Sequence, residues 1–187
     1  NTTRLYDKDI TGGHVGFVLA PCINAQGRLE DNTPSFELLT TQDQKKAKEL
    51  ANKVYKINKK RQKVTEKCYE DALGKANPEN NIMVVQGDYP AGIVGLVAGN
   101  LKEKFEKPAI VLGESNDKGI CKGSCRSVKP LHIKDTLNQC NDLLEGYGGH
   151  KMAAGLSIKT DNIKAFKQRL NEITAGIEYK TVKYDMK

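Results

Sequence analysis

A glycine-rich segment around a histidine has the clearest capacity for chemistry in this sequence. It reads Gly-Tyr-Gly-Gly-His-Lys-Met-Ala-Ala-Gly over residues 146–155, and the small, apolar stretch continues to Ile158. Glycine has no Cβ, so a ligand or another backbone can come close, and the bare N–H donors of such a loop suit phosphate oxygens. His150 adds a titratable donor beside them. These features predict a phosphate contact; the alternative is a strand-entry turn with an incidental histidine.

Two arginines next to glycine or serine extend this pattern. Arg28 lies in Asn-Ala-Gln-Gly-Arg-Leu at residues 24–29, after the apolar run 15–23, and Arg126 lies in Lys-Gly-Ser-Cys-Arg-Ser at residues 122–127. The planar guanidinium group offers a fork of donors that matches phosphate. Two such arginines with a Gly-Gly-His segment in a basic chain indicate a phosphate-handling surface, although a single surface arginine would be unremarkable.

Four motifs occur in an order that resembles a known family. They lie at residues 24–29 (Asn-Ala-Gln-Gly-Arg-Leu), 92–98 (Gly-Ile-Val-Gly-Leu-Val-Ala), 123–127 (Gly-Ser-Cys-Arg-Ser) and 148–155 (Gly-Gly-His-Lys-Met-Ala-Ala-Gly). From about Phe17 to about Ile173 the chain resembles the region downstream of the catalytic DHH domain in the RecJ single-strand-specific exonucleases of the DHH phosphoesterase superfamily. The first motif favours RecJ over the oligoribonuclease and cyclic-dinucleotide phosphodiesterase branches.

The resemblance implies roles for particular residues. Arg28, Ser124 and Arg126 match positions that help to hold the terminal 5′ phosphate or the nearby backbone of the strand. Gly148 and Gly149 match a turn whose N–H groups hold the scissile or an adjacent phosphate. His150 matches a catalytic position that supplies a hydrogen bond or stabilises charge in the transition state. Asn24 is expected to contact phosphate, with a turn-forming side chain as the alternative.

Two positions depart from the family pattern. RecJ-like sequences usually carry an arginine where this chain has Cys22, and a histidine shortly before the Gly-Ile-Val-Gly motif, where this chain has Tyr89-Pro90-Ala91. Each departure removes a polar contact to nucleic acid.

Metal ligands for phosphodiester hydrolysis are not clustered in this sequence. His14, His132 and His150 are far apart, and no Asp-His-His triplet occurs. The resemblance places the Mn²⁺ or Mg²⁺ ligands in the upstream DHH domain, so we expect no metal site in this chain. His14 is expected in a connector and His132 at a helix start. Cys121 and Cys125 share one face of a strand or helix, but no second pair supports zinc.

The net charge of +7 is concentrated in one segment. Residues 45–67 hold ten lysines or arginines against two glutamates, and the remainder of the chain holds twenty basic and twenty-one acidic residues. A focused basic stripe indicates a polyanion partner, and a solvated helix face is the alternative.

Composition also bears on the compartment and on partners. The five scattered cysteines indicate reduced thiols in a cytoplasm, and no run is long enough to span a membrane. We expect a monomer whose partners are single-stranded DNA and an upstream DHH catalytic domain in the same polypeptide.

Hydrophobic periodicity predicts an α/β fold in three parts. Residues 1–40 form a connector with short strand or turn pieces, residues 41–76 a long basic helix, and residues 77–187 an α/β domain. The resemblance implies that residues 1–40 connect to the catalytic domain, that residues 41–76 are a linking helix, and that residues 77–187 are a DHH-associated nucleic-acid-binding domain. The last part is expected to hold a mixed, mainly parallel sheet flanked by helices. The expected strands are 82–86, 109–112, 119–128 and 153–158, with 179–184 a last strand or a linker, and the expected helices are 92–105, 133–144 and one that begins at Asp161.

Three functions are compatible with these features. The first is the DNA-binding C-terminal portion of a RecJ-like 5′–3′ exonuclease acting in DNA repair and recombination, inactive when alone. The second is a stand-alone nucleic-acid- or nucleotide-binding module. The third is a fragment of a phosphodiesterase for small oligonucleotides or cyclic dinucleotides. An Asp-rich DHH region before Asn1 would favour the first of these functions over the second.

Overall fold

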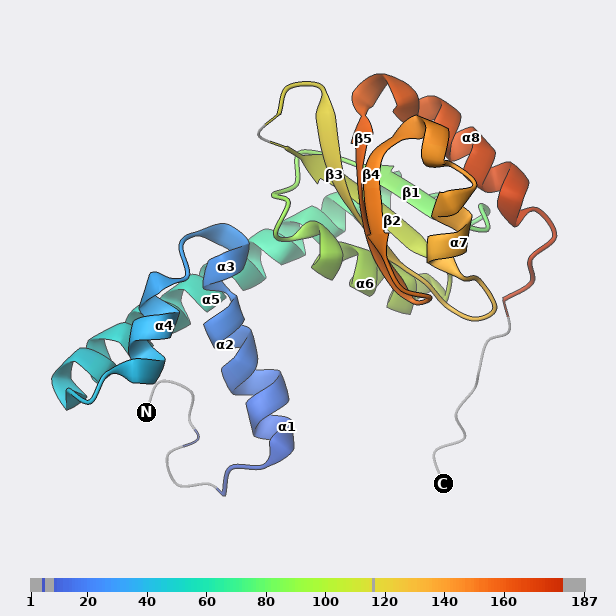
Figure 1. The fold of residues 1–187 in the computed structure, drawn as a ribbon. Coiled ribbons are helices and arrows are strands. Elements are labelled where there is room, and N and C mark those ends of the chain that lie inside the picture. The colour runs from blue at the N-terminus through green and yellow to red at the C-terminus, as the bar shows by residue number, and fades with distance from the viewer. Residues whose placement is uncertain (1–4, 6–8, 116, 180–187) are drawn as a thin grey trace, which may run out of the picture. The chain divides into compact units, whose positions relative to one another are not determined.

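The chain divides into two compact units, Asn1–Glu66 and Lys67–Lys187. The structure, a computed structural model, describes residue 5, residues 9–115 and residues 117–179. The boundary between the units falls inside the long helix α5, Gln44–Lys75 (Figure 1). This long helix confirms that part of the predicted fold, whereas the division at residues 40 and 76 stays a prediction. Within the described residues, no helix is long and apolar enough to cross a membrane.

The unit Asn1–Glu66, called here the helical unit, corrects the prediction of strand or turn pieces. The apolar run at residues 15–23 is helical, because Thr11 starts a helix there: its hydroxyl accepts a hydrogen bond from the His14 N–H at 3.3 Å. Strand propensity is a weak guide when such local contacts favour a helix. The segments before α5 are α1 Gly12–His14, the π-helix η1 Val15–Leu19, α2 Ala20–Asn24, α3 Gln26–Leu29 and α4 Thr33–Thr40.

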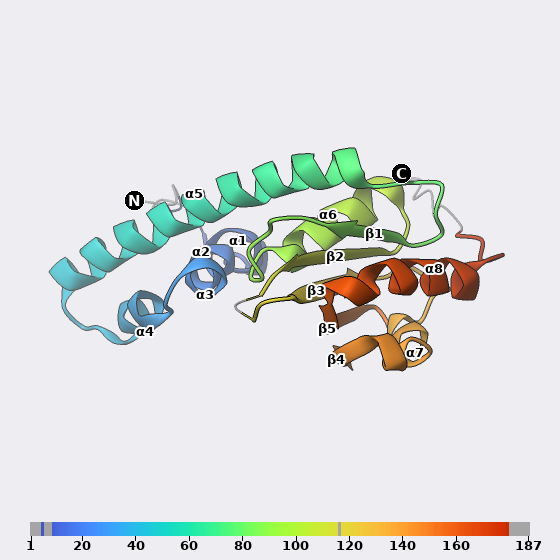
Figure 2. The ribbon, with the colours of Figure 1, turned by 90° about the horizontal axis from the view of Figure 1, so that it is seen from above.

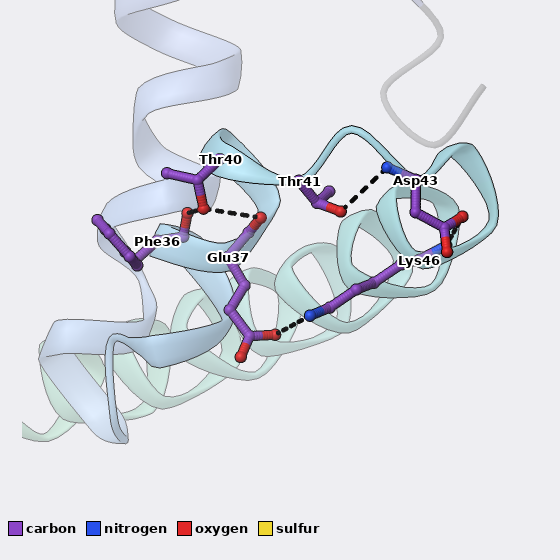
Figure 3. Close-up of polar contacts among 6 residues, drawn as sticks. All are labelled: Phe36, Glu37, Thr40, Thr41, Asp43 and Lys46. Carbon is purple, nitrogen blue, oxygen red and sulfur yellow. Dashed lines mark hydrogen bonds and ion pairs between the residues drawn. The ribbon is translucent and has the colours of Figure 1, made fainter.

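A polar corner joins α4 to the start of α5 (Figure 3). The carboxylate of Asp43 accepts hydrogen bonds from the N–H groups of Lys45 and Lys46, at 2.8 and 3.2 Å. A carboxylate in this place satisfies N–H donors that the first turn of a helix leaves unpaired. The side chain of Lys46 also forms an ion pair with Glu37 at 3.3 Å.

Helix α5 separates apolar from basic residues along its length. Val54 and Ile57 are buried in the helical unit, and Cys68 and Ala72 are buried in the second unit. Most lysines on this helix are exposed. The helix therefore has an apolar stripe, and the predicted basic stripe is present beside it.

The unit Lys67–Lys187, called here the α/β unit, holds one sheet. Among the described residues it has five strands in the order β1-β2-β3-β5-β4. Only β1 and β2 are parallel in this part of the chain, and the other three pairings are antiparallel, so the prediction of a mainly parallel sheet was wrong. Short links join β2 to β3 and β4 to β5, and short links allow only antiparallel neighbours. The strands are β1 Met83–Gln86, β2 Ala109–Glu114, β3 Ile120–Arg126, β4 Leu144–Gly149 and β5 Ala153–Lys159.

Helices cover the two faces of this sheet differently. Helix α6, Val94–Phe105, packs on β2 and β3 at one face, and α7, Ile133–Asn138, lies with α8, Ile163–Thr174, at the other (Figures 1 and 2). The second face forms the larger core, which includes Leu112, Ile133, Ile158, Phe166 and Leu170.

Two further predictions in the α/β unit need correction. The helix expected at residues 133–144 ends at Asn138 and is followed by a short 3-10 turn, η2 Asn141–Leu143. The glycine-rich segment expected as a turn forms the end of β4 and the start of β5, with the turn confined to residues 150–152. Tyr147 of β4 packs against the core and pairs with Leu156 of β5. The predicted last segment lies outside the described residues from residue 180 onward.

Candidate nucleic-acid interface

Strand β3 separates core residues from candidate site residues by simple alternation. Cys121 and Cys125 are buried in the core, whereas Ser124 and Arg126 are half-buried on the opposite face, the face on which α6 packs. This follows because successive side chains of a strand point to opposite faces. Burial raises the pKa of the Cys125 thiol to about 12, so this cysteine stays neutral and inert.

The guanidinium of Arg126 is held in place by two neighbours. Its Nη1 donates to the Ser124 hydroxyl and to the backbone carbonyl of Cys125, both at 2.8 Å. A guanidinium group fixed in this way loses little side-chain entropy when it binds an anion. Arg126 is half-buried on the sheet, where it makes these contacts.

The start of α6 lies beside this arginine. The N-cap residue Ile93 makes no side-chain capping bond, and the backbone of Gly95 in the first turn lies next to the Arg126 and Ser124 side chains. The positive end of a helix dipole favours an anion. Gly95 was not among the residues predicted for the site.

The pairing of β3, β5 and β4 brings the glycine-rich segment near Ser124. Ser124 pairs with Gly155 of β5, and Gly155 pairs in turn with Gly148 of β4. Since adjacent strands lie about 4.8 Å apart, the backbones of Ser124 and Gly148 are about 10 Å apart. Gly148 and Gly155 present bare backbone: among the described residues, no atom would lie within 3.5 Å of a Cβ at either position.

Gly149 and His150 end this strand at the turn into β5. Gly149 has a positive φ of 148°, and a Cβ there would lie 2.5 Å from the Ala153 carbonyl oxygen, so this position requires glycine. The His150 N–H donates to the same carbonyl at 2.8 Å, and the histidine is exposed. Because Ala153 pairs with Arg126, the turn and the arginine lie at the same end of the sheet.

The helical unit holds a second basic cluster around Arg28. Arg28 is half-buried on α3, and Asn24 is exposed at the end of α2. The pKa of the Arg61 guanidinium on α5 is lowered, first by burial and then by the positive charge of Arg28. Two like charges brought together and partly desolvated favour a shared anion.

Arg61 is oriented by Asn58. The side-chain oxygen Oδ1 of Asn58 accepts hydrogen bonds from Nε and Nη2 of Arg61, at 3.1 and 2.9 Å. The Asn58 amide in turn donates to the Cys22 sulfur at 3.2 Å. Cys22, which stands where the family usually has arginine, is therefore buried and helps to position a neighbouring arginine.

A comparison with protein families identifies the second half of the chain. The model of the DHHA1 domain matches residues 79–176, which span the sheet, Arg126 and the Gly-Gly-His segment. The chain belongs to the DHHA1 domain family.

RecJ proteins resemble this chain over most of its length, which confirms the resemblance seen in the sequence. The single-stranded-DNA-specific exonuclease RecJ of Bacillus subtilis is 40% identical over 163 residues, 85% of this chain and 21% of that protein. The crystal structure of RecJ from Thermus thermophilus in complex with Mg²⁺ has a TM-score of 0.82 at 32% identity, over 89% of this chain and 26% of that one. A structure of exonuclease RecJ bound to manganese has a TM-score of 0.80 at 31% identity, over 89% of this chain and 42% of that one. The chain thus spans less than half of the length of each of these three relatives.

Tyr89, which lies where RecJ-like sequences usually carry a histidine, has a structural role in this DHHA1 domain. Tyr89 is buried, and its hydroxyl donates a hydrogen bond to the Asp71 carboxylate at 2.5 Å. The same carboxylate also pairs with the Lys75 ammonium group at 2.6 Å. Burial, and then the hydrogen bond to Asp71, raises the pKa of the Tyr89 phenol. Gly87 makes room for the ring, since a Cβ there would lie 2.2 Å from it. Tyr89 thus anchors the end of α5 and does not replace the missing histidine at a surface.

The histidines do not form a metal centre with other ligands in the described part of the chain, where no three His, Cys, Asp or Glu side chains come together. His14 bonds to Thr11 at the start of α1, and His132 caps α7 by accepting from the Asp135 N–H at 3.3 Å. The described residues therefore do not fit the Mg²⁺ or manganese of the RecJ structures.

Sequence reasoning missed Arg61 and Gly95, and one of them left a signal. Arg61 occupies a position in the otherwise apolar stripe of α5, and a charged residue in such a stripe indicates a specific partner. Gly95 left no such signal, because its importance depends on a neighbour more than 25 positions away in sequence.

Proposed function

We propose that this chain is the DNA-binding portion of a RecJ-like 5′–3′ single-stranded-DNA exonuclease acting in DNA repair and recombination. The observation that carries the proposal is Arg126, fixed by Ser124 beside the start of α6 in a chain homologous to RecJ. A fixed arginine, a hydroxyl and a helix start suit one phosphate group. In this site a terminal 5′ phosphate is held, which determines the bond that reaches the catalytic metals.

The turn at the end of β4 serves the neighbouring part of the strand. Gly148 and Gly149 offer backbone that a phosphate or a sugar can approach closely, and His150 is exposed beside them. In this proposal His150 is the catalytic contribution of the chain, as a donor to a phosphate oxygen when negative charge develops.

The helical unit contributes binding of a more general kind. Arg28 and Arg61 attract one phosphate together, with Asn24 beside them, and the exposed lysines of α5 attract the rest of the backbone. Such contacts do not depend on the base sequence.

A catalytic domain in the same polypeptide completes the proposal. The Mg²⁺ or Mn²⁺ of such an enzyme supplies the activated water and charge stabilisation, and its ligands come from that domain. Exposed apolar side chains on the helical unit support such a partner: Phe17 is 87% exposed, Phe36 68% and Leu39 66%.

The organisation follows from the same proposal. Residues 1–40 connect to the catalytic domain, residues 41–76 link, and residues 77–187 bind nucleic acid in a monomeric enzyme. All five cysteines are buried free thiols, which suits the reducing cytoplasm.

The proposal is tested by binding and activity of the 187-residue chain. We expect anisotropy of a labelled single-stranded oligonucleotide to show weak binding that falls steeply with salt. With Mn²⁺ added, we expect no release of nucleotides. An affinity unchanged by salt contradicts the electrostatic part. Metal-dependent release that His150→Ala abolishes would place the active site in this chain.

A further inference from the structure

We propose that Gly95 positions the Arg126 guanidinium and thereby sets the preference of this site for a terminal phosphate. The inference rests on the proposed function, because it concerns the same phosphate site. Gly95 acts through Arg126 and Ser124, so it is a positioning residue and not a catalytic one.

The geometry leaves little room for a Cβ at this position unless the neighbouring side chains shift by a few tenths of an ångström. A Cβ on Gly95 would lie 3.0 Å from Nη2 of Arg126 and 3.1 Å from the Ser124 hydroxyl oxygen. Carbon atoms pack at about 3.5–4.0 Å from their neighbours, so both groups would have to move. The Ser124 hydroxyl accepts the 2.8 Å hydrogen bond from Nη1 of the same guanidinium, so moving either group disturbs the contact that fixes Arg126.

The helix itself gives no reason for glycine at this place. Glycine is a poor helix former, and Gly95 does not have the positive φ that favours it. Gly99, one turn further along α6, offers a direct contrast: among the described residues, no atom lies within 4 Å of where its Cβ would be. The two glycines share a helix and a residue type, and only Gly95 touches the candidate site.

The position of the guanidinium matters more for a terminal phosphate than for an internal one. A terminal phosphate carries nearly two negative charges at neutral pH, and an internal phosphodiester carries one. Charge-assisted hydrogen bonds depend on close, aligned donors. Displacing Arg126 by a few tenths of an ångström therefore reduces the advantage of the terminal phosphate while the general attraction of the basic residues remains.

The test compares Gly95→Ala with Gly99→Ala in the 187-residue chain. The probes are short 3′-labelled single strands with a 5′ phosphate or a 5′ hydroxyl, and the readout is the ratio of the two affinities. We expect Gly95→Ala to reduce the wild-type preference for the phosphate by about tenfold, the effect of one charge-assisted contact. Gly99→Ala is expected to leave the ratio unchanged.

A double-mutant cycle separates the positioning of Arg126 by Gly95 from general damage to the fold. In an Arg126→Ala background, Gly95→Ala should cause no further change in the ratio, because the group that it displaces is gone. An unchanged ratio in Gly95→Ala overturns the inference and leaves the proposed function standing. An equal loss on both probes, or a melting temperature far below that of Gly99→Ala, also overturns it by making Gly95 structural. A wild-type chain without any preference for the phosphate overturns the proposed function, and the inference with it.

Discussion

The two units of this chain hold positive charge in opposite ways. In the helical unit, apart from Arg61, which Asn58 orients, the positive charge is mostly that of exposed lysines along α5. In the α/β unit, one arginine is tied to Ser124 and to a backbone carbonyl at 2.8 Å. The first arrangement provides many weak and mobile contacts, and the second provides one contact of defined geometry.

This difference predicts that one unit sets the affinity for a nucleic-acid strand and the other sets the position of the strand's end. Mobile lysines attract any phosphate backbone, and their contribution falls with salt because counterions are released. A fixed arginine favours the phosphate that fits its fork. We therefore expect the helical unit to govern how tightly a strand binds and the α/β unit to govern where its end lies.

The largest expected effect comes from removing four exposed lysines of α5 together. The variant replaces Lys48, Lys53, Lys56 and Lys63 with glutamine. We expect affinity for single strands at low salt to fall more than tenfold, and the slope of log affinity against log salt to decrease by about 3, at roughly 0.7 for each contact. Anisotropy titrations over a salt series measure both, and strands with a 5′ phosphate or a 5′ hydroxyl should lose equally.

A matched variant tests whether the position of the charge matters. It replaces four exposed lysines of the α/β unit, Lys104, Lys118, Lys134 and Lys164, with glutamine and changes the net charge by the same amount. We expect a much smaller loss. Equal losses in the two variants would show that net charge alone drives binding.

The next effect concerns the fixed contacts of the α/β unit. Tyr89→Phe removes the hydrogen bond to Asp71 and should lower the free energy of unfolding by about 1 kcal/mol. The raised pKa of Tyr89 means that its contribution is intact below pH 10 and is lost as the pH rises further, because the unfolded phenol ionises first. Chemical denaturation at neutral and at alkaline pH should therefore show that the free energy of unfolding decreases more with pH in the wild type than in Tyr89→Phe. A parallel decrease in Tyr89→Phe would assign the alkaline sensitivity to other groups.

The smallest effect is expected at Asn58. Asn58→Ala removes the acceptor that orients Arg61, so affinity should fall by about twofold to fivefold for both kinds of strand. Gln62→Ala, an exposed neighbour on the same helix, is the control. A loss confined to 5′-phosphorylated strands would contradict the separation of roles between the units.

Sequence patterns predicted the two units unequally, for physical reasons. The strands around Ile110 and Cys125 and the helix containing Phe166 follow from buried apolar periodicity, which is local. The helices before α5 were missed because a run such as residues 15–23 is compatible with a strand or a helix, and the Thr11 cap decides between them. Sheet direction was also missed, since it depends on which strands become neighbours.

The candidate site shows the same limit. Ser124, Arg126 and Gly148 were predicted from local motifs, and strand pairing brings them to one part of the sheet. Gly95 depends on a contact between elements distant in sequence, and no local pattern indicates it, whereas the signal of Arg61 was its place in the apolar stripe of α5. The roles assigned to all of these residues stay predictions.

The most direct test is Arg126→Ala in the 187-residue chain, with strands that carry a 5′ phosphate or a 5′ hydroxyl. If Arg126 holds the terminal phosphate, the variant loses a charge-assisted contact of roughly 1.5–3 kcal/mol on the phosphorylated strand, at least tenfold in affinity, and much less on the other. Its melting temperature should stay close to that of the wild type. Equal losses on the two strands would reduce Arg126 to a general backbone contact, and a large drop in melting temperature would make it a structural residue and contradict the phosphate site.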